Sequence, residues 1–159
     1  MVFVCLGTQT YPFDRLLKGL DILIEKNIVT EDIFAQVGTL NYIPKHFKYV
    51  QFMSHEEFDE KRKKASLIIS HGGTGALIGA SKLGKNIVAV PRLSKFGEHV
   101  DDHQLQIVSV LESEGYIRAV YDIDDLGKTI LEALSNPITK VYERKSSIVK
   151  IITDYLENN

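Results

Sequence analysis

The chain has 159 residues, of which 44% are hydrophobic, enough for a single domain (1–159) with a buried core. Its 21 acidic and 19 basic side chains give a net charge of −2, which argues against nucleic acid as a partner. A single cysteine excludes an internal disulfide, and apolar runs too short to span a bilayer predict a cytoplasmic protein.

The first third of the chain alternates between strand-like and helix-like segments. Residues 2–6 form a continuous apolar run, typical of a strand covered on both faces. Apolar residues at helical spacing over 13–24 predict a helix, and 33–38 and 48–52 read as the next two strands. Ser54 and Glu57 have the spacing of a capping box and predict the start of another helix.

That helix ends in a basic cluster, residues 61–64. Such side chains complement the negative end of a helix and usually stay solvated. Attraction to an anionic lipid surface is the alternative interpretation.

The alternation continues through the second half of the chain. The expected elements are a strand at 66–70, a helix to Lys85, a strand at 87–90, a helix around 105–111, a strand at 116–120, a helix from Asp124 to the break at Asn136-Pro137, and an amphipathic tail at 138–156. The pattern predicts an α/β fold, a three-layer, doubly wound parallel sheet with ligands at the carboxyl ends of the strands.

A glycine cluster separates the strand at 66–70 from the next helix. Its sequence is His71-Gly72-Gly73-Thr74-Gly75. Glycines let backbone N–H groups approach a ligand, and a helix start favours an anion, so the turn predicts a diphosphate site. A turn that merely fits the strand to the helix is the alternative. No P-loop pattern is present, which argues against an ATP-hydrolysing loop.

A dinucleotide site fits the glycine spacing less well. Gly73, Gly75 and Gly79 are one residue too widely spaced for the fingerprint. Pro91-Arg92 follows the next strand where an NAD site would have an acidic residue. The glycine spacing weakens the interpretation as an NADP site. That interpretation stays open, because Arg92 suits a 2′-phosphate.

The densest polar segment of the chain follows Arg92. His99, Asp102 and His103 are spaced i, i+3 and i+4, so on a helix they would share one face and could hold the metal of a hydrolase. Asp101 and Asp102 also suit the capping of a helix start. The interpretation we prefer is a site for a sugar nucleotide.

In that interpretation, Glu98 or an aspartate accepts hydrogen bonds from sugar hydroxyls. His103 and Gln104 would present donors to the same sugar nucleotide.

These motifs together resemble a known family. In chain order they are Gly7-Thr8-Gln9, Gln36-x-Gly38, His71-Gly72-Gly73-Thr74-Gly75, Pro91-Arg92 and Glu98-His99-x-Asp101-Asp102-His103-Gln104. They resemble the C-terminal, donor-binding half of MurG-type transferases (glycosyltransferase family 28). They are closer still to the soluble subunits of two-component transferases of bacterial capsule and exopolysaccharide synthesis, and to the soluble catalytic subunit of the eukaryotic lipid-linked N-acetylglucosaminyltransferase.

The resemblance implies a GT-B fold, in which two Rossmann-like halves face each other and the C-terminal half binds the sugar donor. Only one half is present here. The chain would therefore bind a UDP-sugar as substrate, need no metal or other cofactor, and work with a membrane-anchored partner at the inner face of the cell membrane. That partner would bind the lipid-linked saccharide acceptor and supply the catalytic base, so this hexosyltransferase subunit would transfer sugar poorly alone.

The resemblance also assigns residues. Gly7, Thr8 and Gln9, together with residues 71–75, would hold the diphosphate. The donor sugar and ribose would lie near Glu98, His99, Asp102, His103 and Gln104, with His103 and Arg92 as possible assistants in catalysis.

One departure concerns the ribose. MurG-type enzymes hold it with a glutamate that aligns here with Ser81, and Glu98 is a possible substitute. The tail at 138–156 would contact the partner or pack on its own sheet. The rival class is a non-catalytic, nucleotide-binding, flavodoxin-like module.

Overall fold

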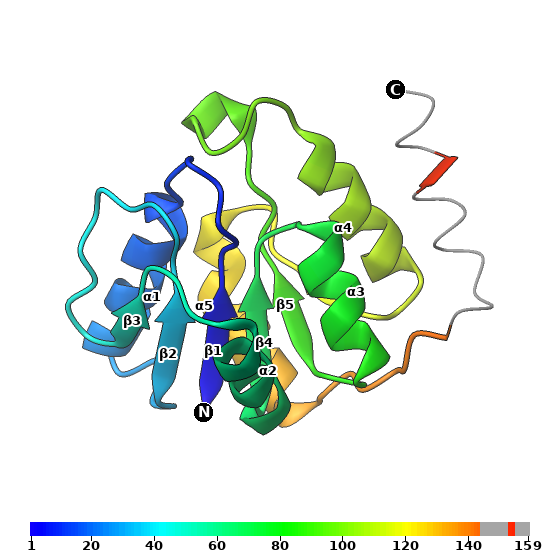
Figure 1. Cartoon of the computed structure of the whole chain (residues 1–159). Helices are drawn as coiled ribbons and strands as arrows, with labels where there is room; N and C mark the ends of the chain where they lie inside the picture. Colours follow the sequence, from blue (N-terminus) through cyan, green and yellow to red (C-terminus); the bar gives the residue numbers. More distant parts are fainter. Residues whose placement is uncertain (144–152, 155–159) are drawn as a thin grey trace.

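A parallel sheet forms the centre of the molecule. The computed structural model describes residues 1–143 and 153–154. Within them, six parallel strands follow the order β3-β2-β1-β4-β5-β6 (Figure 1). The strands are β1 (Val2–Cys5), β2 (Ile33–Gln36), β3 (Lys48–Val50), β4 (Leu67–Ser70), β5 (Ile87–Ala89) and β6 (Arg118–Ala119). The order reverses between β1 and β4, which places the topological switch point between these two strands.

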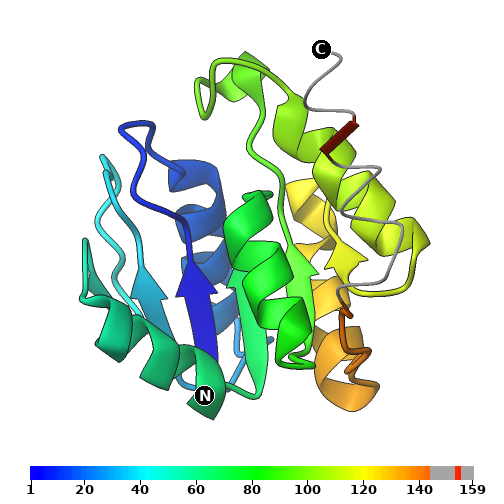
Figure 2. The same cartoon turned by 45° about the vertical axis from the view of Figure 1, so that its right-hand side comes forward.

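Helices cover both faces of the sheet. They are α1 (Asp14–Glu25), α2 (His55–Lys64), α3 (Thr74–Lys82), α4 (His103–Ser113) and α5 (Leu126–Ser135), with 3-10 turns η1 (Ser94–Phe96) and η2 (Ile123–Asp125). Helices α1 and α5 pack on one face, and α2, α3 and α4 pack on the other (Figures 1 and 2). The predicted three-layer, doubly wound α/β fold is confirmed.

Strand β1 shows why this sequence forms a central strand. Val2 and Val4 face the core under α1 and α5, whereas Phe3 and Cys5 face the core under α2, α3 and α4. All four side chains are at most 3% exposed. Each large apolar side chain buried in this way contributes about 1.5–3 kcal/mol, so a continuous apolar run is needed here.

Helix α2 begins as its sequence predicts. The Ser54 side chain accepts from the Glu57 N–H while the Glu57 side chain accepts from the Ser54 N–H, which completes the capping box. Its basic end is not uniformly solvated. Arg62 pairs with Asp59 at 2.7 Å and is one-fifth exposed, whereas Lys64 is 72% exposed.

The elements near the C-terminus differ from the prediction in their bounds. Strand β6 has two residues instead of five. Helix α5 begins at Leu126 instead of Asp124, because the Asp122 carboxylate accepts from the Asp124 N–H and stabilises a 3-10 turn first. Residues 138–143 are not helical, and the rest of the tail, apart from 153–154, lies outside the described residues. Among the described helices, none has the length and hydrophobicity needed to cross a bilayer.

Candidate functional site

The turns that follow β1 and β4 meet at the carboxyl edge of the sheet, at the switch point. Gly7 follows β1 with φ +76°, and its carbonyl accepts from the Gln36 Nε2 at 3.0 Å. Gln36 also donates to the Gln51 carbonyl at 2.8 Å, which ties the turn after β1 to the turn after β3. A Cβ at Gly38 would lie 2.7 Å from the Gly7 carbonyl oxygen, so the backbone fits closely only without one. These contacts explain the Gln36-x-Gly38 pattern.

The glycine turn leads directly into α3. Gly73 is the N-cap residue of α3 and makes no side-chain cap hydrogen bond. The first N–H groups of an α-helix have no partner within the helix, and the helix dipole makes this end positive. Apart from its chain neighbours and the backbone of α3 itself, no atom of the described residues lies within 4 Å of a Cβ built on Gly75, so the backbone there faces open space. This end of α3 is therefore arranged to receive an anion.

His71 lies beneath this turn and is 7% exposed. A Cβ at Gly73 would lie 2.2 Å from its Cε1, and one at Gly7 would lie 3.0 Å from its Nε2. The imidazole therefore occupies the space that two side chains would otherwise fill. Burial, reinforced by the positive charge of Arg92, lowers the pKa of His71 to about 4, so the ring is neutral at pH 7.

Gln104, in the first turn of α4, joins three parts of the site. Its Oε1 accepts from the N–H groups of Gly72 at 3.0 Å and Arg92 at 3.1 Å, and its Nε2 lies 3.0 Å from His71 Nδ1. The side chain is buried, with the residue 4% exposed. The predicted contact of Gln104 with the donor sugar stays a prediction, and in this structure its amide bonds to the protein.

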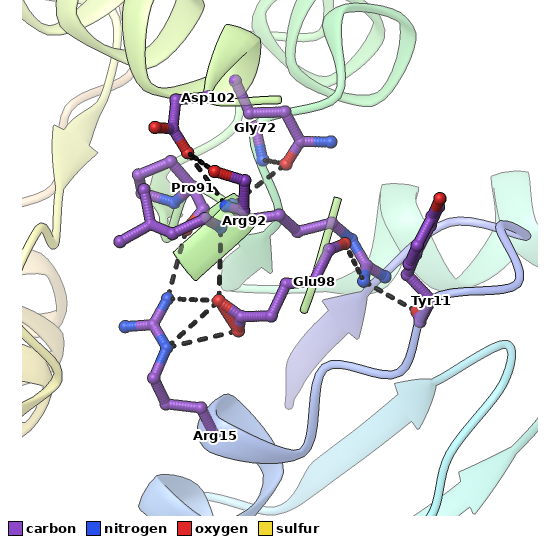
Figure 3. A network of polar contacts seen from close by, with 10 residues as sticks. Tyr11, Arg15, Gly72, Pro91, Arg92, Glu98 and Asp102 are labelled. Atoms are coloured by element: carbon purple, nitrogen blue, oxygen red, sulfur yellow. Dashed lines mark hydrogen bonds and ion pairs between the residues drawn. The ribbon is translucent and has the colours of Figure 1, made fainter. Parts of the chain in front are cut away.

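Arg92, predicted as an assistant in catalysis, is buried and bonds to the protein backbone. It is 1% exposed, and its guanidinium donates to the carbonyls of Tyr11 at 2.8 Å and Glu98 at 3.3 Å (Figure 3). It also donates to the Leu6 carbonyl at 2.6 Å. Burial lowers the pKa of Arg92 to about 10, which still leaves it charged at pH 7. Arg92 thus ties the segment after β5 to the turn after β1, and it does not face an outer ligand.

Glu98 makes a buried ion pair instead of a sugar contact. Its carboxylate accepts from Arg15 of α1 at 3.0 to 3.3 Å and from the Leu93 N–H at 3.2 Å (Figure 3). Its side chain is 3% exposed. The predicted role of Glu98 for the sugar or ribose stays a prediction, and in this structure its carboxylate is buried and bonds to the protein. Arg15 was missed in the sequence because its partner is 83 residues away.

The predicted metal triad is not assembled. Helix α4 begins at His103, so His99 and Asp102 precede it and share no helical face with it. The Asp102 carboxylate accepts from the Ser94 N–H and Oγ, which lowers the pKa of Asp102. The His99 ring stacks on the Tyr11 ring, with 6.2 Å between the ring centroids. In residues 1–143 and 153–154, no three His, Cys, Asp or Glu side chains are grouped to hold a metal. The alternative named Asp101 and Asp102 as capping residues. The Asp101 carboxylate accepts from the His103 N–H, whereas Asp102, the N-cap residue of α4, makes no side-chain cap hydrogen bond.

The remaining predicted residues divide by exposure. Thr8, Gln9 and Gly75 are exposed at the carboxyl edge of the sheet, and Thr74 is partly exposed. Ser81 is fully buried and its Oγ has no hydrogen-bond partner among the described residues. Ser81 therefore cannot contact a ribose from this position.

A small apolar cavity of about 210 Å³ adjoins the glycine turn. It is lined by Cys5, Gly7, Thr8, Gln36, Met53, Ser54, His55, Phe58 and Ala76. The sequence analysis missed the part that comes from residues 53–58, although a turn after a parallel strand belongs at this edge. A larger cavity, about 600 Å³, lies at the opposite edge, where Met1, Ile33 and Lys48 are found at the starts of their strands. We place the site at the carboxyl edge because the switch point and the uncapped helix start are both there.

The fold defines a Rossmann-like domain, equivalent to the C-terminal half of a GT-B glycosyltransferase. Residues 1–157 match the family described as the glycosyltransferase family 28 C-terminal domain. The chain belongs to this family and is a glycosyltransferase domain.

One curated relative is the mouse (Mus musculus) protein UDP-N-acetylglucosamine transferase subunit ALG13, 25% identical over 122 residues. The match covers 72% of this chain and 10% of that protein's length. The solution structure of ALG13 has a TM-score of 0.62 at 17% identity, with 98% of this chain and 96% of that one covered.

MurG of Acinetobacter baumannii has a TM-score of 0.54 at 16% identity, with 98% of this chain and 49% of MurG covered. The forosaminyltransferase SpnP has a TM-score of 0.59 at 15% identity, with 98% of this chain and 39% of SpnP covered. Both structures contain the fold of this chain. This chain spans about half of MurG and less than half of SpnP.

Proposed function

We propose that this chain is the UDP-sugar-binding catalytic subunit of a two-component glycosyltransferase. The observation that carries the proposal is the turn His71-Gly72-Gly73, which ends at an uncapped helix start beside the switch point. The diphosphate would accept hydrogen bonds from the N–H groups of residues 73–76, with Thr8 and Gln9 facing it from the turn after β1. The same donors would stabilise the charge that grows on the leaving UDP, without a metal.

The nucleobase would occupy the apolar cavity beside Gly7. Met53, Phe58 and Ala76 give this cavity apolar walls, which suit a flat base, and Ser54 and His55 add polar groups. The donor sugar would then lie toward His99, Asp102 and His103. Arg92, Glu98 and Gln104 would support this arrangement from beneath.

A partner half is part of the proposal because of the family and the named relative. The chain matches the C-terminal domain of its family and covers 49% of MurG. ALG13 is itself named as a subunit of a transferase. A separate, membrane-attached partner would bring the lipid-linked saccharide and the general base that takes the acceptor proton. The transferred sugar would be a hexose, used in capsule or exopolysaccharide synthesis at the inner face of the membrane.

Calorimetry tests the donor-binding part of the proposal. UDP and UDP-hexoses should bind the isolated chain, whereas uridine, which lacks phosphates, should bind much more weakly. Thr8→Val removes a hydroxyl at the proposed site and should weaken UDP binding, and Lys48→Ala, at the opposite edge of the sheet, should not. No heat at millimolar UDP would refute the proposal.

Turnover distinguishes a transferase subunit from a non-catalytic nucleotide-binding module. The chain alone should release little UDP from UDP-hexose, and adding the membrane-attached partner with its lipid-linked acceptor should increase the release. UDP binding without turnover in the presence of the partner would favour the non-catalytic module.

A further inference from the structure

The amide of Gln104 has only one orientation that satisfies its contacts. Its Oε1 faces two backbone donors, the N–H groups of Gly72 and Arg92, at 3.0 and 3.1 Å. Turning the amide over would place its NH₂ group against both donors. The Nε2 of Gln104 therefore faces Nδ1 of His71, 3.0 Å away, and donates a hydrogen bond to it.

This contact fixes the proton on the other side of the imidazole. A neutral histidine carries one ring proton, and a nitrogen that accepts a hydrogen bond does not carry it. Because Nδ1 of His71 accepts from Gln104, Nε2 carries the proton. The charged form is disfavoured by burial and by the charge of Arg92, with a smaller effect from His99.

The protonated edge of the ring lies at the turns that form the site. Cβ atoms built on Gly7 and Gly73 would lie 3.0 and 2.7 Å from His71 Nε2. His71 is only 7% exposed, and among the described residues its Nε2 has no hydrogen-bond partner. An N–H donor on a mostly buried ring, without an acceptor among the described residues and next to the start of α3, suits an anionic oxygen of a ligand.

We propose that Gln104 is a positioning residue for diphosphate binding: its side-chain amide holds His71 as the Nε2–H tautomer, so that a neutral N–H donor faces the ligand between Gly7 and Gly73. The proposal rests on the proposed function for its ligand. In this proposal Gln104 acts through the groups that its amide bonds to, which are His71, the Gly72 N–H and the Arg92 N–H.

Gln104→Glu gives the sharpest test. Glutamate has the shape of glutamine, and one carboxylate oxygen can still accept from Gly72 and Arg92. The other oxygen replaces the NH₂ donor with an acceptor, so His71 should move its proton to Nδ1. The ¹⁵N shifts of the imidazole report the tautomer directly, and a His71→Phe variant assigns the His71 signals.

The measurements are made at about pH 8.5, where His71 is neutral and the terminal phosphate of UDP, with a second pKa of about 6, is ionised. We expect Nε2–H in the ligand-free wild type and Nδ1–H in Gln104→Glu, and UDP should bind the variant about tenfold more weakly, because a hydrogen bond to a charged group is lost. Far-UV circular dichroism of both proteins checks that the variant is folded.

Two outcomes would overturn the inference: Nδ1–H in the wild type, or a tautomer change in Gln104→Glu with unchanged UDP affinity. Should the variant not fold, wild-type spectra with and without UDP decide, because the His71 Nε2–H signal must shift on binding. Failure of the proposed function is seen separately, as no UDP binding by the wild type. In that case the ligand-free spectrum still shows whether Gln104 sets the tautomer, while the diphosphate role falls.

Discussion

The fit of the glycine turn against α4 predicts the effect of Gly72→Ala. A Cβ at this position would lie 2.5 Å from Gln104 Cβ and 2.9 Å from the Gln104 carbonyl oxygen. Carbon atoms pack at about 3.5–4.0 Å, so the start of α4 must move by about 1 Å. No rotamer change relieves this clash, because the atoms in contact are Cβ and backbone atoms of Gln104.

The expected loss has two parts. Overpacking costs about 1–3 kcal/mol. The shift also weakens the bonds of the Gln104 amide to Gly72, Arg92 and His71, each worth about 1 kcal/mol. Gly72→Ala should therefore lower the free energy of unfolding by about 2–4 kcal/mol.

Urea unfolding followed by far-UV circular dichroism measures this loss, since the chain has no tryptophan. Gly75→Ala is the matched control. Its Cβ would meet no atom within 4 Å outside the backbone of its own helix in the part of the chain that the structure describes, and Gly75 lies in α3. The change should therefore leave stability unchanged or raise it by up to about 1 kcal/mol. A Gly72→Ala protein within about 0.5 kcal/mol of the wild type would show that the packing argument is wrong.

Three further predictions follow from buried polar groups. Arg15→Met should lower the free energy of unfolding by about 3 kcal/mol in urea, because Glu98 keeps a buried charge without its partner, and adding Glu98→Gln should restore part of this loss. Because the pKa of His71 is lowered to about 4 in the folded protein, the unfolded chain takes up this proton at a higher pH than the folded chain does. The free energy of unfolding should therefore fall by up to about 3 kcal/mol as the pH drops from about 6.5 to about 4. A His71→Asn variant that loses as much stability over this pH range would refute the prediction. Ser81→Ala removes a buried hydroxyl that has no partner in the described part of the chain, so the free energy of unfolding in urea should stay or rise, and a fall above about 1 kcal/mol would contradict the burial argument.

The fold could be predicted because its signals are local. Continuous apolar runs such as residues 2–6 mark strands covered on both faces, and the capping box at Ser54 marks a helix start. The bounds at Asp124 were missed because the side chain of Asp122 forms a 3-10 turn first, which apolar spacing does not show. The packing of residues within the layers also follows from the alternation of faces.

The polar segment after β5 shows what spacing does not reveal. Glu98, Arg92 and Gln104 read as ligand-binding side chains because polar residues at a carboxyl edge often are. Their partners lie far along the chain: Arg15 is 83 residues from Glu98, and the Leu6 carbonyl is 86 residues from Arg92. Only the folded arrangement shows that these groups bond to each other and form a support beneath the glycine turn.

Backbone amide shifts during a UDP titration test the central claim most directly, because they locate the ligand. We predict that UDP shifts the ¹H–¹⁵N signals of residues 72–76 and 7–9, while signals around Met1 and Lys48, at the opposite edge of the sheet, stay in place. Shifts confined to that opposite edge, with residues 72–76 unchanged, would contradict a diphosphate site at the start of α3.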